Sequence, residues 1–138
     1  MLNFNGTPWL EKCFRSLRSQ TVFDQLELIL ADNNSPDGSA RLAERLLCDW
    51  PKAKVMQHGQ NLGFCEGNNR AAREARGDYL FFLNNDTWLE EDCLEKLVAR
   101  VEQMEAQAGT PLMLNYEDSS VQSAGGQGFD IFGLMSLA

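Results

Sequence analysis

Short apolar runs alternate along the chain with segments in which apolar residues recur every three or four positions. The runs predict β-strands at residues 2–4, 26–31, 53–58 and 79–83. The run at 79–83, Tyr-Leu-Phe-Phe-Leu, is the clearest candidate for a buried strand. Because strands and helices alternate, the pattern favours an α/β domain whose mostly parallel sheet carries helices on its faces.

The segments between the runs predict helices. The first begins near Thr7 and Pro8, which are residue types favoured at a helix N-terminus. Its buried stripe consists of Leu10, Cys13, Phe14 and Leu17. Further helices are predicted after residue 39, at 71–76 and at about 90–107, with a Gly- and Asn-rich loop at 59–69 and a last strand at 112–116.

Composition and charge exclude several classes of protein. The 138 residues suffice for one domain with a core, and the net charge of -8 disfavours nucleic acid as a partner. The four cysteines form no CxxC pair and His58 is the one histidine, which argues against structural zinc and for a reduced, cytoplasmic protein. Membrane association is not evident, because no apolar run is long enough to span a bilayer.

Polar side chains follow the predicted strands. Asp32 leaves the second strand, Asp86 follows the apolar run at 79–83, and Asn3 and Asn5 lie near the end of the first. In open parallel sheets, ligands bind beyond the carboxyl ends of the strands. Asp86 suits an oxygen-rich Mg²⁺ or Mn²⁺ site, although it could equally cap the next helix, and Asp32 could be a turn residue.

Helix capping is the more favoured role for the Asp37-Gly38-Ser39 turn. Asp and Ser are common at this position because their side-chain oxygens accept hydrogen bonds from the first free N–H groups of a helix. We therefore expect Asp37 to stabilise the second helix rather than to contact a ligand.

Four blocks in order resemble glycosyltransferase family 2. The first is Asn3-Phe4-Asn5-Gly6, and the second, at residues 32–39, reads Asp-Asn-Asn-Ser-Pro-Asp-Gly-Ser. The third runs from Asn61-Leu62-Gly63-Phe64 to Asn68-Asn69-Arg70, and the fourth, Asn84-Asn85-Asp86, stands where the family has its DxD motif. The stretch at 122–126 with Phe129-Asp130 is similar to the rhamnosyltransferase-like branch.

The resemblance implies a GT-A fold, Rossmann-like and incomplete in its C-terminal half. Residues 1–108 would be the nucleotide-sugar-binding half and residues 109–138 the start of the acceptor side. The implied reaction is metal-dependent, inverting transfer of a sugar from a nucleotide-diphospho-sugar donor to a saccharide or lipid-linked acceptor. The catalytic base is unknown and expected beyond Ala138, so this chain is expected to be inactive in transfer.

The resemblance also implies roles for individual residues. Phe4 would lie against the nucleobase, Asp32 would hydrogen-bond the base or ribose, and Asp86 would ligate Mg²⁺ or Mn²⁺. Asn84 replaces the first carboxylate of the motif and should weaken metal binding. The full set of expected donor contacts is Asn3, Phe4, Asn5, Asp32, Asn61, Asn69, Asn84 and Asn85.

Two other interpretations stay open. The chain could be a non-catalytic nucleotide-binding or interaction module derived from the same half-fold. A phosphate-transferring α/β domain would need a Lys or Thr beside a nucleophilic Asp, and no Lys occurs between Lys54 and Lys96. The tail at 123–134, with Phe129, Ile131 and Phe132, is expected to be exposed and could pair two copies of the chain.

Overall fold

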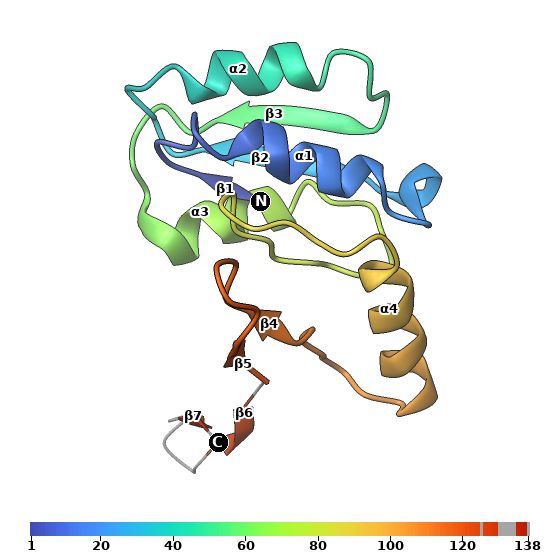
Figure 1. Ribbon diagram of the computed structural model, residues 1–138. Helices are drawn as coiled ribbons and strands as arrows, with labels where there is room; N and C mark the ends of the chain where they lie inside the picture. The colour runs from blue at the N-terminus through green and yellow to red at the C-terminus, as the bar shows by residue number, and fades with distance from the viewer. Residues whose placement is uncertain (125, 130–134, 138) are drawn as a thin grey trace. The chain divides into compact units, whose positions relative to one another are not determined.

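The structure, a computed structural model, describes residues 1–124, 126–129 and 135–137. The chain divides into two compact units, Met1–Asp92 and Cys93–Ala138. The first unit contains β1 (Leu2–Asn3), α1 (Leu10–Arg18), the 3-10 helix η1 (Phe23–Gln25), β2 (Leu28–Asp32), α2 (Ser39–Leu46), β3 (Ala53–Gln57) and α3 (Gly63–Ala72) (Figure 1). The second contains α4 (Cys93–Gln103), β4 (Met113–Leu114), β5 (Val121–Ser123), β6 (Gly126–Phe129) and β7 (Met135–Leu137).

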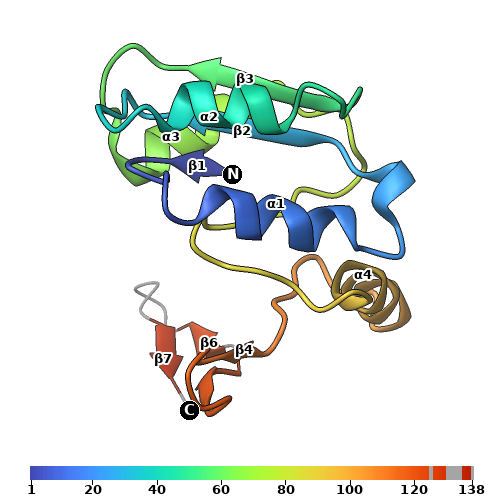
Figure 2. The ribbon, with the colours of Figure 1, turned by 45° about the horizontal axis from the view of Figure 1, so that its top comes forward.

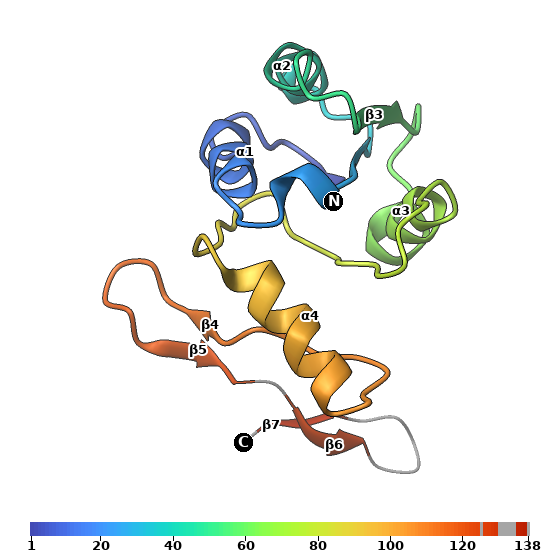
Figure 3. The same cartoon turned by 90° about the vertical axis from the view of Figure 1, so that its right-hand side faces the viewer.

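The first unit is built on a parallel sheet in the order β1-β2-β3, which confirms the predicted α/β class. All five residues of the central strand β2 are buried. Because side chains alternate along a strand, Ile29 and Ala31 face one side, where they pack with Ala71 of α3. Figure 3 shows α1 and α2 on the opposite side of the sheet from α3, so helices cover both faces.

Helix α1 carries the buried stripe that its spacing predicts, since Leu10, Cys13, Phe14 and Leu17 are all buried. Desolvation raises the pKa of the Cys13 thiol to about 12, so this cysteine is a packing residue and not a nucleophile. The predicted start near Thr7 is wrong by one turn. Thr7 Oγ1 donates to the Asp37 carbonyl instead of capping the helix.

The loop predicted at 59–69 is confirmed only for residues 59–62, because α3 begins at Gly63. Of the short helix predicted at 71–76, only Ala71 and Ala72 are helical, and they end α3. Asn61 Oδ1 accepts the N–H of Gly63, the first residue of the helix, at 2.9 Å. Gly67 lies against Leu2, and a Cβ at this position would overlap the leucine side chain. Gly67 therefore serves a close helix–strand approach, which glycine content alone does not distinguish from a loop.

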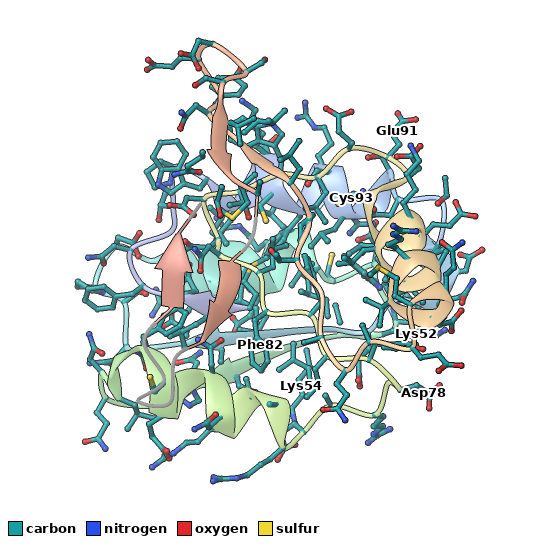
Figure 4. The ribbon with its side chains drawn as sticks, turned by 90° about the horizontal axis from the view of Figure 1, so that it is seen from below. Lys52, Lys54, Asp78, Phe82, Glu91 and Cys93 are labelled. Carbon is teal, nitrogen blue, oxygen red and sulfur yellow. The ribbon has the colours of Figure 1, made fainter. Side chains whose placement is uncertain are left out.

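The prediction of a buried strand at 79–83 is wrong. Tyr79 is 52% exposed and Phe82 is 57% exposed (Figure 4), and one parallel bridge, Leu2 with Asn84, joins this stretch to the sheet. The rest of the run lies in the irregular segment between α3 and α4 and takes part in no ladder among the described residues (Figure 2).

The second unit begins with α4, which is shorter than the helix predicted at 90–107. β4 pairs with β5, and β6 pairs with β7, each antiparallel. The two compact units divide before α4. The functional division into a donor half at 1–108 and an acceptor side at 109–138 stays a prediction. Of the tail, Ile131 and Phe132 lie outside the described residues, and only the backbone of Phe129 is described. Within the described residues no helix has the length and apolar character needed to cross a membrane.

Candidate functional site

The ends of β1 and β2 bring polar side chains together, as their positions in the sequence predict. Asn3 and Asp32 are register partners in the parallel ladder. Both are buried, with 0% and 2% of their surfaces exposed. Asn3 Nδ2 donates to Asp32 Oδ1 at 2.7 Å, so the two side chains meet directly.

The Asp32 carboxylate is held by the turn that follows it. Ser35 donates to it twice, from its backbone N–H at 2.8 Å and from its hydroxyl at 2.6 Å. The Ser35 hydroxyl in turn accepts the backbone N–H of Asn5, which has a positive φ of 56°. With Asn3 as the third donor, both carboxylate oxygens of Asp32 accept hydrogen bonds from the protein, and only 2% of the residue is exposed, which favours a supporting role over direct contact with a base or ribose.

Asp37 links the turn after β2 to the turn after β1. Its carboxylate accepts the N–H of Thr7 at 3.0 Å, the N–H of Ser39 at 3.0 Å and the Ser39 hydroxyl at 2.6 Å. Desolvation works to raise the pKa of Asp37, but the bonds from Ser39 and Thr7 outweigh it and hold the pKa well below the ordinary value. Since Ser39 is the first residue of α2 and Gly38 is its N-cap, Asp37 satisfies a free helix N–H from one residue before the N-cap position.

Asn33 is a site residue that sequence reasoning missed. It is 2% exposed, and its Nδ2 donates to Asn61 Oδ1 at 3.0 Å and to the Gly63 carbonyl at 3.1 Å. Its Oδ1 accepts the N–H of Leu62 at 3.2 Å. Asn33 thus fixes the loop that enters α3. The available signal was its place directly after Asp32, where strand alternation turns it toward the α3 side of the sheet.

Asp86 differs from Asp32 and Asp37, whose carboxylates are hydrogen-bonded to the protein. It is exposed, and among the described residues its carboxylate makes no hydrogen bond or ion pair. Its neighbour Asn85 is half-buried and donates from Nδ2 to Asn3 Oδ1 at 2.7 Å. Further along, Lys12 Nζ lies 3.8 Å from the centre of the Trp88 ring. The segment that carries Asp86 is therefore anchored on both sides of a free carboxylate.

The other predicted site residues are distributed around this centre. Phe4 is 47% exposed, and Asn61, Asn69 and Asn84 are exposed as well. The structure thus joins Asn3, Asp32 and Asn85 directly. Asn5 joins them through Ser35, whereas Asn61 belongs to the adjoining network of Asn33.

The family resemblance implies a divalent cation at this site, and the residues present can be compared with what such an ion needs. No set of three His, Cys, Asp or Glu side chains that could hold a metal occurs in the described part of the chain. Mg²⁺ and ions like it are commonly held by one or two carboxylates together with substrate phosphates and water. The free Asp86 carboxylate and the exposed Asn84 amide fit such a site, in which the substrate supplies the remaining oxygens.

Comparison with known proteins identifies the family of this chain. The family model "Glycosyl transferase family 2" matches residues 1–128. The uncharacterized glycosyltransferase EpsJ of Bacillus subtilis (strain 168) is 31% identical over 100 residues, which are 72% of this chain and 28% of EpsJ. The narrower likeness of residues 122–126 to rhamnosyltransferases stays a prediction.

Solved structures show the fold. TarS 1-349 of S. aureus, crystallised with UDP-GlcNAc, has a TM-score of 0.68 and 19% identity over 84% of this chain and 37% of its own. PcManGT, a mannosyltransferase from Pyrobaculum calidifontis in complex with GDP-Man and Mn²⁺, has the same TM-score and 23% identity over 72% of this chain and 30% of its own. The chain thus spans well under half the length of these relatives. By its sequence this chain belongs to glycosyl transferase family 2, and it has the GT-A fold.

Proposed function

We propose that this chain forms the donor-binding part of an inverting glycosyltransferase. It takes a nucleoside diphosphate sugar together with Mg²⁺ or Mn²⁺, and the sugar passes to a saccharide or lipid-linked acceptor. The observation that carries the proposal is the contrast among three aspartates. Asp32 and Asp37 are engaged with protein donors, whereas Asp86 stands exposed with no partner in the described residues.

Electrostatics gives a reason for metal dependence. A chain with a net charge of -8 repels a diphosphate unless a positive group intervenes. Asp86 would hold the divalent ion, which when bound would act as a Lewis acid and neutralise charge on the leaving nucleoside diphosphate. Asn84 adds a neutral oxygen ligand, so Asp86 provides the only protein charge of the motif.

The chain's own residues shape the rest of the pocket. The exposed ring of Phe4 offers an apolar face for a nucleobase, and Asn5 is held beside it by the bond from its N–H to Ser35 Oγ. Asn61, two residues before α3, and Asn69, in the C-terminal half of α3, are both exposed and supply amide groups. Asp32 contributes indirectly, by fixing Ser35 and Asn3.

We also propose that residues 1–138 lack the general base of the transfer reaction. Such a base must lie within hydrogen-bond reach of the acceptor hydroxyl. The Asp86 carboxylate is already assigned to the metal, and the carboxylates of Asp32 and Asp37 accept hydrogen bonds from the protein.

A thermal-shift panel tests the donor part of the proposal. A ligand that binds only the folded chain raises its melting temperature by mass action. UDP, GDP and dTDP are each added with and without Mn²⁺. A rise that needs both one of the nucleotides and the metal supports the proposal, and a folded chain that shows no shift with any pair refutes it.

A further inference from the structure

The side chain of Asn3 is a buried carboxamide whose two ends serve different segments. Its Nδ2 group donates to Asp32 Oδ1 at 2.7 Å and to Ser39 Oγ at 2.8 Å. Its Oδ1 atom accepts from Asn85 Nδ2 at 2.7 Å. No part of Asn3 is exposed, so water does not compete for these bonds. One amide therefore joins the exits of β1 and β2 to the segment at 84–86.

The chemistry of the partners fixes which way this amide points. The Asp32 carboxylate can only accept, and the Ser39 hydroxyl gives its hydrogen to Asp37 Oδ1 at 2.6 Å. Both atoms thus need a donor from residue 3. The Nδ2 group must face them, and Oδ1 is left to face Asn85. A carboxylate at position 3 could not donate, and an apolar side chain would leave buried polar groups unpaired.

Gly6 closes the space around the bond between Asn3 and Asn85. A Cβ on Gly6 would overlap both Asn3 Oδ1 and Asn85 Nδ2. The bond is therefore enclosed by backbone on that side, and any side chain at position 6 would displace one of its two partners.

We propose that Asn3 is a positioning residue for the Asp86 carboxylate. It acts through Asn85, because the bond holds the 84–86 turn against the end of β1. The backbone of Asp86 is then held at a fixed position beside the sheet, while its carboxylate oxygens make no hydrogen bond to the described residues. This role rests on the proposed function, since it has a purpose only if Asp86 meets a metal and a diphosphate. It replaces the expected direct contact of Asn3 with the donor.

The test measures how much Mn²⁺ strengthens the binding of UDP and of GDP to the 138-residue chain, by calorimetry with and without the metal. Asn3→Asp keeps the size of the side chain but places a carboxylate beside Asp32. We expect the Mn²⁺-dependent gain in affinity to fall about tenfold or more, as for other partners of metal ligands. The exchange variant Asn3→Asp/Asp32→Asn removes the repulsion between two carboxylates while residue 3 can still accept from Asn85, so it should recover part of the gain, although Ser39 Oγ stays without its donor.

Further variants keep the proposal falsifiable if Asn3→Asp does not fold. Asn85→Ala and Gly6→Ala remove the same bond while Asn3 keeps its amide, and each should lower the Mn²⁺-dependent gain. Asn68→Asp is the matched control, because Asn68 is another buried amide, bonded to the Phe64 carbonyl, outside this network.

Two results overturn the role of Asn3. One is a full Mn²⁺-dependent gain in Asn85→Ala, and the other is an equal loss in Asn68→Asp. A gain that survives Asp86→Ala overturns the proposed function itself, so the two failures can be told apart.

Discussion

The side-chain amide of Asn85 donates to the side-chain oxygen of Asn3 across 82 positions of the sequence, at 2.7 Å. This bond connects the motif that carries Asp86 to the first strand of the sheet. The resemblance to glycosyltransferase family 2 implies that both residues contact the donor. Their bond to each other shows that polar residues at strand exits also bind one another.

Asp37→Ala should destabilise the chain without removing metal-dependent nucleotide binding. The substitution removes bonds from Thr7 and from the first helical residue Ser39, a loss comparable to that of a helix cap. We expect the free energy of unfolding to fall by about 1 kcal/mol in urea denaturation. The role assignments would be reversed if Asp37→Ala abolished nucleotide binding while stability stayed the same.

The same carboxylate makes stability depend on pH. The pKa of Asp37 is lowered in the folded chain from its ordinary value of 3.8, so the unfolded chain binds a proton first as the pH falls. Its contribution is complete above the ordinary pKa and is lost as the pH falls through the lower, folded pKa. Urea denaturation of the chain and of Asp37→Asn should therefore differ at about pH 6 and converge toward about pH 2. Curves that run parallel over this range would contradict the assignment.

Asn33→Leu should loosen the loop that enters α3. The leucine is similar in size but makes none of the bonds to Asn61, Leu62 and Gly63. Leaving the part-buried Leu62 N–H and Gly63 carbonyl without this partner should cost about 1 kcal/mol of stability. Amide hydrogen exchange at Leu62 should accelerate as well.

Asn69→Leu is the control for this change, because it makes the same substitution at an exposed position of α3. It should alter the free energy of unfolding by less than about 0.5 kcal/mol. Equal losses in the two variants would mean that the Asn33 bonds add no stability.

How far the sequence predicts the fold depends on how local each signal is. The stripe of Leu10 and Phe14 and the short buried strand β2 depend on spacing within one element, and both are confirmed. The run at 79–83 has the composition of a buried strand, but pairing depends on a neighbouring strand in register. In the described structure one bridge, between Leu2 and Asn84, joins this stretch to the sheet, and composition cannot reveal how far such pairing extends.

The candidate site also has features that the sequence predicts and features that depend on the three-dimensional structure. The positions of Asp32 and Asp86 after apolar runs predicted one shared edge of the sheet, and the register of β1 with β2 places Asn3 beside Asp32 there. The sequence does not reveal which of these side chains hydrogen-bond to one another. That depends on three-dimensional bonds, such as those from Ser35 to Asp32 and from Asn33 to the loop before α3.

The 138-residue chain should not transfer sugar to an acceptor. Transfer needs a base at the acceptor hydroxyl and a wall that holds the acceptor in a reactive geometry. The comparison is product formation by this chain and by a full-length family 2 relative, with the same donor and acceptor. Slow hydrolysis of the donor remains compatible with this expectation. Transfer at the rate of the relative would place a base within these residues, and Glu117, Asp118 and Asp130 would be the first to replace.

The central claim is that Asp86 makes nucleotide binding depend on a metal, and calorimetric titration tests it most directly. UDP and GDP are each titrated, with and without Mn²⁺, into three proteins: the unchanged chain, Asp86→Ala and Asp78→Ala. Asp78 is the matched control because it is also an exposed aspartate of the first unit and does not follow a strand of the sheet. The account predicts metal-dependent binding of at least one nucleotide by the chain and by Asp78→Ala, and loss of the metal-dependent part in a folded Asp86→Ala. Binding that is indifferent to Mn²⁺, or that is unchanged in Asp86→Ala, would contradict it.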